Sequence, residues 1–389
     1  MLFLLELYQA LGPCSLRSDE NPRPLHADAS AKVALFRERF ELVHQRLRRN
    51  DLFTPPVLGA SKPEYVELTP IESLPGVRGT AATVLGLIIQ PEEGDFALED
   101  LQRSIRADFS HAETTAGLFT EGSIVLAQGV LQDDDVFRVD MMGFPPAEPR
   151  VQSLVAMGSV DPFQVIRTPA EWSAAHALER AASDVMFVVA SDIHLDQPDV
   201  MAQLETMFRG FTQCGVVPDM FILCGPFMLS PFGSHRDDRR TFVRLMDSLA
   251  DLIARFPSIT STSRFVLVPG PNDPGSAGVL PQPPLPRSFC KSLEDRVANV
   301  TLASNPCRIR FHTQEIVIFR ENLLSRMRRC CVVPPRTEET VDLTEHLART
   351  VVDQSHLCPL PLVRQPVYWA HDVGLRLFPV PDVVRYISF

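Results

Sequence analysis

The feature that most constrains this chain is an alternation of short apolar runs and amphipathic stretches in its second half. Apolar runs of the strand type lie at Val185–Ala190, Phe221–Cys224 and Phe265–Val268. Between them, apolar residues recur at intervals of three and four, first from Val200 to Phe211 and then from Phe242 to Phe256. The order strand, helix, strand, helix, strand predicts an α/β layered domain with a partly parallel sheet.

The preceding part of the chain, residues 61–150, has a different rhythm, in which short strand-like runs are separated by turn residues. The candidate strands are Thr83–Gln90, Asp95–Leu98, Ile105–Phe109, Gly122–Gln128 and Val136–Met141. Several short strands in so few residues predict a small closed barrel of the OB type. The expected fold class is therefore α+β and multi-domain, with an OB-type β-barrel followed by an α/β sandwich.

The charge of the barrel region bears on its function. The whole chain has a net charge of -11, and residues 61–150 carry 6 basic and 16 acidic side chains, a net charge of -10. An OB-fold that binds single strands needs a positive groove with exposed aromatic rings. A structural or protein-binding barrel is therefore favoured, and a single-stranded DNA-binding OB module is kept as an alternative.

Changes in composition and the positions of turn-forming residues divide the chain into consecutive segments. The proposed boundaries are an unassigned N-terminal segment over residues 1–30, an amphipathic helix and Pro linker over 31–60, the barrel over 61–150, a connecting segment with a helix over 151–182, and the α/β domain over 183–389. The eight cysteines form no C-x-x-C pair and no zinc-type spacing, which favours reduced thiols in an intracellular protein. No apolar run reaches the roughly 18–20 residues of a membrane span.

A candidate metal site follows the first strand of the α/β domain, in the sequence Asp192-Ile193-His194. Ligands of open α/β sheets gather beyond the carboxyl ends of the strands. A carboxylate and an imidazole two residues apart can hold one cation together, as in metal-dependent phosphoesterases, where two cations activate water and clamp the phosphate. An active phosphoesterase that uses Asp192 and His194 is therefore the first alternative function.

The later loops lack the ligands that such an enzyme needs. Pro226 stands where the bridging Asp is expected, and Asn272 takes the place of the phosphate-facing His. His356 could supply a later histidine ligand, but no terminal Gly-His-x-His follows it. We therefore treat Asp192, His194, Asn272 and His356 as vestigial metal-site positions, and we expect no catalytic residue, no bound metal and no cofactor.

An acidic OB-like barrel followed by a phosphoesterase-type domain with broken metal ligands resembles the B-subunit family of the replicative DNA polymerases, and within it the polymerase epsilon branch. The resemblance runs from about residue 30 to 385. It rests on Leu52–Val57, Gly143–Pro146, Phe221–Gly225, Phe265–Pro271 with Asp273–Gly275, Leu280-Pro281 with Pro283–Leu285, Asn305–Ile309, Thr313–Ile316 with Phe319-Arg320, Pro359–Leu362, and Pro366–Ala370.

The resemblance implies a non-catalytic scaffold subunit in the nucleus. Its partners would be the C-terminal region of the polymerase epsilon catalytic subunit, the other subunits of that complex and components of the replicative helicase. DNA contact would be indirect or weak, and no membrane would be involved. Four aromatic residues are of the type found at interfaces, although core packing is the favoured role for each: Phe232, Phe289, Tyr368 and Trp369.

The sequence departs from the family at three places. His194 restores a phosphoesterase-like residue, and residues 1–30 do not resemble the family's small N-terminal helical domain. The sequence also ends at Phe389, where relatives continue with β-structure. We therefore expect the phosphoesterase-type sheet to be incomplete at its C-terminal end, with an unpaired edge, and the chain alone to be poorly soluble.

Overall fold

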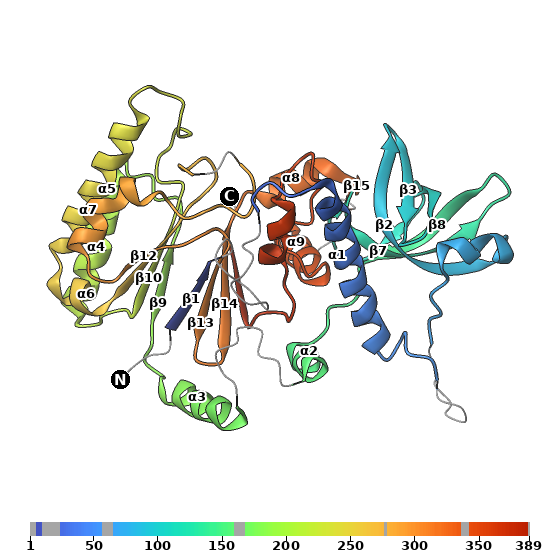
Figure 1. Ribbon diagram of the computed structural model, residues 1–389, viewed down its shortest axis with the longest axis horizontal. Helices are drawn as coiled ribbons and strands as arrows, with labels where there is room; N and C mark the ends of the chain where they lie inside the picture. The colour runs from blue at the N-terminus through green and yellow to red at the C-terminus, as the bar shows by residue number, and fades with distance from the viewer. Residues whose placement is uncertain are drawn as a thin grey trace. The chain divides into compact units, whose positions relative to one another are not determined.

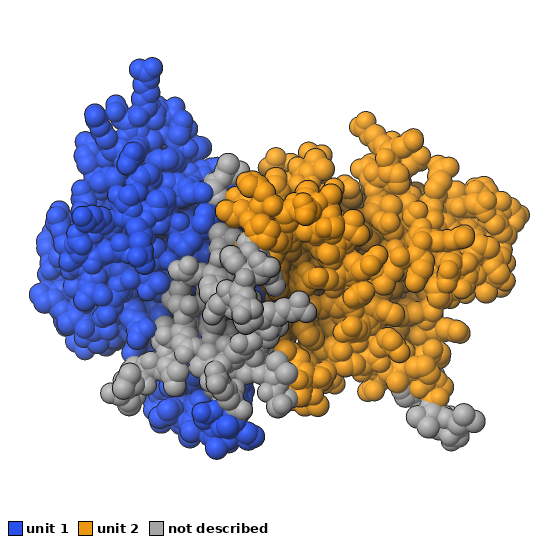
Figure 2. Space-filling model, viewed as in Figure 1, with its two compact units in different colours: residues 1–23, 159–322, 381–389 blue, residues 24–158, 323–380 orange. Residues whose placement is uncertain are grey.

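The computed structural model describes residues 5–9, 24–56, 65–158, 168–275, 278–335 and 342–387. The chain forms two compact units, each assembled from separate stretches of sequence (Figure 2). Unit 1 consists of residues 1–23, 159–322 and 381–389, and unit 2 consists of residues 24–158 and 323–380. Most of the segment 1–30, residues 57–60 of the Pro linker and residues 159–167 of the connecting segment lie outside the described residues.

Unit 1 contains the predicted parallel sheet, with the strand order β12-β11-β10-β9 (Figure 1). Its strands are β9 (Phe187–Ala190), β10 (Met220–Cys224), β11 (Arg264–Val268) and β12 (Val300–Leu302), and each pairs in parallel with its neighbour. Helices α4 (Pro198–Cys214), α5 (Asp238–Ala254), α6 (Pro257–Thr262) and α7 (Arg287–Arg296) pack on one face. The three apolar runs and the two amphipathic stretches thus form the predicted strands and helices.

The helix face of this sheet holds an aromatic core. Phe221 and Phe265 lie side by side on adjacent strands with their rings stacked at 5.2 Å, and Phe208 of α4 meets Phe221 edge-on. All three side chains are completely buried. Each such burial stabilises the fold by roughly 1.5–3 kcal/mol. β10 reads as a continuous apolar run because its alternate side chains, such as Ile222, are buried on the opposite face of the sheet.

A second sheet covers the opposite face of the parallel sheet, with the order β1-β13-β14-β16. Its strands are β1 (Leu5–Gln9), β13 (Cys307–Phe311), β14 (Gln314–Arg320) and β16 (Val383–Ile387). Ile222 and Val266 of the parallel sheet are buried in one cluster with Ile309 and Ile318 of the second sheet. Unit 1 is therefore an α/β sandwich, as predicted. Helix α3 (Pro169–Ala181) begins with a capping box formed by Thr168 and Glu171.

Unit 2 contains the predicted barrel. Its strands are β2 (Ala81–Glu92), β3 (Asp95–Glu99), β4 (Ser104–Asp108), β5 (Glu113–Thr114), β7 (Ile124–Leu131) and β8 (Val136–Gly143). They follow the order β4-β3-β2-β7-β8-β5, and β4 also pairs with β8, so that the sheet closes on itself. Closure gives partners to backbone N–H and C=O groups that would otherwise be unpaired at the edges of the sheet. The interior is filled by buried side chains such as Val84, Leu98 and Phe137.

The remaining elements of unit 2 surround this barrel. They are α1 (Ala29–Arg49), α2 (Arg150–Met157), α8 (Leu323–Cys330), α9 (Leu343–Asp353), the 3₁₀ helices η1 (Ile71–Val77) and η2 (Trp369–Leu375), and the short pair β6 (Phe119–Thr120) with β15 (Cys331–Val333). Phe40, Val43 and Leu47 recur along α1 and pack against Leu85 and Ile124 of the barrel. These three residues thus lie on the face that α1 buries against the barrel, whereas Val33, in the first part of the helix, is exposed.

Residues 323–380 belong with the barrel in the structure, although they follow the α/β domain in the sequence. Side chains of α9 hold them there. His346 Nδ1 accepts the backbone N–H of Gly117 at 2.8 Å, and Gln354 bonds both the N–H and the C=O of Ile124. The assignment of residues 183–389 to one domain stays a prediction. The two compact units are defined by their internal contacts, and such contacts do not show which parts fold independently. Among the described residues, no helix is long and apolar enough to cross a membrane.

Candidate functional site

Asp192, one of the predicted vestigial metal-site positions, lies two residues after the end of β9 and is bound by an arginine. Arg320, the last residue of β14, donates from its guanidinium to Asp192 Oδ1. Its Nε donates to Gly225 O at 3.1 Å, and Nη1 donates to Ile387 O at 3.3 Å. The Arg320 side chain is 1% exposed, whereas the Asp192 side chain is 21% exposed. A fixed cation of the protein itself therefore neutralises the carboxylate.

His194 and Asn272 lie in loops of the same unit. The backbone N–H of His194 donates to Asp192 O at 2.9 Å, so that Asp192 and His194 form one tight turn. Asp192 and Asn272 both have positive φ angles, 57° and 72°. Asn272 O accepts the backbone N–H of Phe232 at 3.0 Å, which ties its loop to the loop that follows β10.

The loops that follow β10 and β11 cross closely beside this position. A Cβ on Gly270 would lie 2.4 Å from the backbone of Gly225 and Pro226, so the crossing requires glycine. The Asp273 carboxylate holds the two crossing loops together, because it accepts the N–H of Phe227 from one loop and the N–H of Gly270 from the other, each at 2.9 Å. Burial raises the pKa of Asp273 to about 7, although the two N–H donors and Arg320 act in the opposite direction.

The donor set does not fit a pair of divalent cations. Arg320 takes up the Asp192 carboxylate, Pro226 has no side-chain donor atom, and Asp273 is engaged by two backbone amides. Burial also raises the pKa of the nearby Cys224 thiol to about 12, which keeps it protonated. Among the residues that the structure describes, no three His, Cys, Asp or Glu side chains form a group that could hold a metal ion.

The fourth vestigial position, His356, belongs to unit 2 and has its own partners there. Its Nδ1 accepts the backbone N–H of Cys358 at 3.0 Å, so Nε2 carries the proton and donates to Asp372 at 3.1 Å. Burial, together with Arg39, lowers the pKa of His356 to about 4. Both ring nitrogens are therefore occupied in a neutral imidazole, and His356 contributes to the packing of unit 2.

Asp372 is the centre of a buried ionic cluster in unit 2. Arg39 of α1 binds both of its carboxylate oxygens, and Arg376 Nε lies 3.2 Å from Oδ2. Burial alone would raise the pKa of Asp372, but Arg39 and His356 hold it well below its usual range. The cluster joins α1 to η2 and has no open side for a substrate, since Arg39 is 9% and Asp372 1% exposed.

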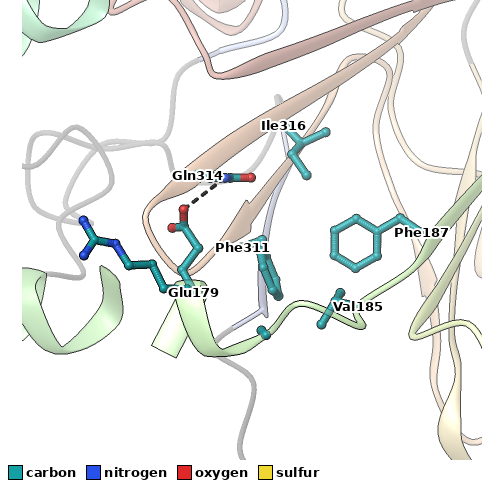
Figure 3. A pocket seen from close by; sticks show the side chains of 8 residues that line it. Glu179, Val185, Phe187, Phe311, Gln314 and Ile316 are labelled. Atoms are coloured by element: carbon teal, nitrogen blue, oxygen red, sulfur yellow. Dashed lines mark hydrogen bonds between the residues drawn. The ribbon is translucent and has the colours of Figure 1, made fainter. Parts of the chain in front are cut away.

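A pocket of about 330 Å³ in unit 1 was not expected from the sequence (Figure 3). Phe187 and Phe311 meet edge-on at 5.4 Å in its wall, beside Val185 and Ile316. Its one carboxylate, on Glu179, accepts from Gln314 Nε2 at 3.0 Å and from Thr313. The pocket thus offers apolar walls, one engaged carboxylate and the side chain of Arg180, and its lining residues include no nucleophile and base set for catalysis.

The four interface-type aromatic residues are all half-buried. Phe232 and Phe289 pack against the core beside Phe242, with ring centroids 5.8–6.0 Å apart. Tyr368 lies edge-on to His371 at the start of η2, next to Trp369. None is an isolated surface ring.

Arg320 and Asp273 are the site residues that the sequence analysis did not identify as site residues. The local sequence feature that could have pointed to Arg320 is an arginine at the end of the apolar run Ile316–Phe319.

A closed OB-type barrel in one unit and an α/β sandwich in the other define a class of two-part proteins. The family model for the DNA polymerase alpha/epsilon B subunit matches residues 187–388, and the model "DNA polymerase epsilon subunit 2-like, OB-fold domain" matches residues 29–146. The chain belongs to the B-subunit family of DNA polymerases alpha and epsilon.

Sequence similarity to curated relatives extends along nearly the whole chain. The DNA polymerase epsilon B subunit of Arabidopsis thaliana is 43% identical, over 93% of this chain and 69% of the relative. DNA polymerase epsilon subunit 2 of Bos taurus is 41% identical, over 94% and 69%. DNA polymerase epsilon subunit 2 of Homo sapiens is also 41% identical, over 91% and 67%.

Proposed function

We propose that this chain is the accessory subunit of a nuclear DNA polymerase epsilon complex. The observation that carries the proposal is 41–43% identity, over more than nine-tenths of the chain, to relatives named as that subunit. Both units are included, because the two family models together span residues 29–146 and 187–388. The chain acts by holding other proteins and not by turning over a substrate.

The specific partner in this proposal is the C-terminal region of the catalytic subunit. The acidic barrel supports a protein partner, since its net charge of -10 over residues 61–150 opposes phosphate binding. Other subunits of the complex and components of the replicative helicase complete the set of proposed partners. An interface of standard or larger size is expected for a permanent subunit.

The direct experiment is co-expression of the full chain with the tagged C-terminal region of the catalytic subunit. The N-terminal polymerase region of the same subunit is the control bait. We expect a stoichiometric complex on size exclusion with the C-terminal bait and none with the control. Equal recovery with both baits, or with neither, contradicts the proposal.

We further propose that the phosphoesterase-type unit is catalytically inactive. The ion pair between Arg320 and Asp192 supports this, because the guanidinium occupies the carboxylate that a metal would need. Pro226 and Asn272 supply neither a bridging carboxylate nor an imidazole. Purified protein given Mn²⁺ and a generic phosphodiester should show no turnover, and turnover abolished by Asp192→Ala would establish the alternative of an active enzyme.

A single-stranded DNA-binding barrel is the second alternative. Its signature would be salt-dependent oligonucleotide binding that depends on basic residues of the barrel, such as Arg103 and Arg138. We expect Arg103→Glu with Arg138→Glu to leave any oligonucleotide binding by the full chain unchanged. A loss of binding in that variant would favour this alternative.

A further inference from the structure

A groove of about 460 Å³ lies in unit 2, between the first half of α1 and the barrel. On the α1 side it is lined by side chains from residues 32–40. On the barrel side it is lined by residues 87–89 of β2, by residues 99–101 at the end of β3 and in the loop after it, and by residues 121–122. Residues 361–363 complete the lining, so the whole groove belongs to one compact unit.

Large apolar side chains are exposed along this groove. Val33 of α1 is 61% exposed, Leu101 is 39% exposed and Val363 is 91% exposed. Phe36 and Leu362 are half-buried and line the same groove. The three exposed residues are far apart in the sequence, and the fold brings them to one place. A continuous exposed apolar surface with charged residues around it marks a site of contact with another molecule.

The packing of α1 shows that this apolar surface is not part of the core of unit 2. Phe40, Val43 and Leu47 pack against the barrel, whereas Val33 and Phe36 lie outside that buried cluster. The first turns of α1 therefore carry apolar side chains that the barrel does not cover. Helix formation does not require them, because Lys, Arg, Glu and Gln have better helix propensities than Val or Phe.

Charged side chains flank the groove in two groups of opposite sign. Lys32 and Arg37 are exposed on the α1 side, and Glu99 and Glu121 lie on the barrel side. Within the described residues, no ion pair joins the two groups. Asp100 also lines the groove, but its carboxylate already accepts the backbone N–H groups of residues 71, 102 and 103. Two cations and two carboxylates are thus available to an occupant.

Glu121 is the least exposed of these four charged side chains. It is half-buried, and burial raises its pKa, although Arg364 acts in the opposite direction. In the part of the chain that the structure describes, its carboxylate forms no hydrogen bond and no ion pair. A partly desolvated carboxylate without a partner costs free energy, which a cation from another molecule would recover.

The backbone around the groove offers no free strand edge to an occupant. β2 pairs with β3 and with β7, and β3 also pairs with β4. The backbone groups of α1 bond within the helix. An extended peptide would therefore gain no ladder of backbone hydrogen bonds from these elements, whereas a helix satisfies its own backbone groups. These pairings favour a helix as the occupant.

We propose that this groove binds an amphipathic α-helix of another protein, with a basic residue that pairs with Glu121 and an acidic residue that pairs with Lys32 or Arg37. The apolar face of that helix covers the exposed apolar side chains of the groove, which removes them from water. The charges of opposite sign fix the orientation of the helix. A helix with charges of one sign on both edges would meet a like charge on one side of the groove. This proposal goes beyond the accessory-subunit role and does not depend on it.

The test measures the fluorescence anisotropy of three labelled helical peptides of about 18 residues with the full chain. All three have the same leucine face. The first carries Lys along one edge and Glu along the other, the second carries Lys along both edges, and the third carries Glu along both. We expect the first to bind at least about ten-fold more tightly than either of the others. Tightest binding of the all-Lys peptide would indicate attraction by the net charge of -11 alone. That result, tightest binding of the all-Glu peptide, or no binding of the first peptide would overturn the proposal.

Substitutions in the groove give the second part of the test. Val33→Ser with Val363→Ser should weaken binding of the first peptide about ten-fold or more. The matched control, Val151→Ser with Val155→Ser, makes the same change at valines of α2 that are 72% and 75% exposed, and it should leave binding unchanged. Glu121→Gln should narrow the difference in affinity between the first peptide and the all-Glu peptide. Equal losses in the two valine variants, or an unchanged difference in Glu121→Gln, would contradict the proposal. If circular dichroism shows that Val33→Ser loosens α1, Val363→Ser alone against Val151→Ser alone makes the same comparison.

Discussion

The Arg320 guanidinium donates to the Asp192 carboxylate across 128 residues of sequence, just beyond the carboxyl end of β9. One residue ends a strand of the mixed sheet and the other follows a strand of the parallel sheet. The cation that pairs with Asp192 is therefore part of the chain. Its positive charge serves the stability of unit 1.

Replacement of Arg320 should destabilise unit 1 strongly. Arg320→Met removes donors from Gly225 O and Ile387 O and leaves Asp192 without its partner. Breaking a buried pair in this way costs about 3 kcal/mol of unfolding free energy, which urea denaturation measures. Arg287→Met, at an 87% exposed arginine of the same unit, should change the value by less than about 0.5 kcal/mol. Similar effects of the two substitutions would contradict the structural role of Arg320.

Asp273 should make the stability of unit 1 depend on pH. Its folded-state pKa of about 7 lies above the ordinary value of 3.8, so the folded state holds the proton more tightly than the unfolded state does. The resulting stability is present below the unfolded pKa and is lost as pH rises through 7. Between about pH 5 and pH 8, the free energy of unfolding should fall by roughly 1–3 kcal/mol more than in Asp273→Asn. Parallel pH profiles for both proteins would refute the raised pKa.

Substitution of Gly270 by alanine should prevent the crossing of the two loops. The new Cβ would meet the backbone of Gly225 and Pro226 at 2.4 Å, and neither can move without displacing Asp273. We expect a loss of more than about 4 kcal/mol or no folded unit 1, as seen by limited proteolysis. Gly210→Ala in α4 is the matched control, because nothing lies within 4 Å of its Cβ. Alanine there should stabilise the helix by up to about 1 kcal/mol.

Neutralising Asp372 should loosen α1 from unit 2. Asp372→Asn leaves the 9% exposed Arg39 without a carboxylate, which costs about 3–5 kcal/mol by urea denaturation. Glu38→Gln is the matched control, since Glu38 is 55% exposed and contacts only the outer side of the cluster through Arg376. Its effect should stay below about 1 kcal/mol. A larger effect at Glu38 than at Asp372 would show that the buried cluster is not what holds α1.

The sequence predicted those parts of the fold that are encoded locally. Apolar periodicity located α1, α5, the parallel strands and most of the barrel, because each pattern lies within one element. Asp192 could be placed at a strand end for the same reason. The partner of Asp192 could not be found, because Arg320 reaches it only once two sheets face each other. Likewise, nothing local to His356 shows that its segment returns to the barrel and buries it beside Asp372.

The packing of residues 323–380 with the barrel has a consequence for how the chain folds during its synthesis. Arg39, near the beginning of unit 2, finds its carboxylate 333 residues later, and Arg46 finds Ser355 309 residues later. Domains of most proteins fold in the order in which they leave the ribosome. Here α1 and the barrel emerge before residues 323–380 and cannot reach their final partners until those residues have been made. Contacts of such long sequence separation are slow to form. The earlier-made part of unit 2 is therefore completed only when the later part joins it, and until then it exposes apolar surface that a chaperone or a partner subunit could cover.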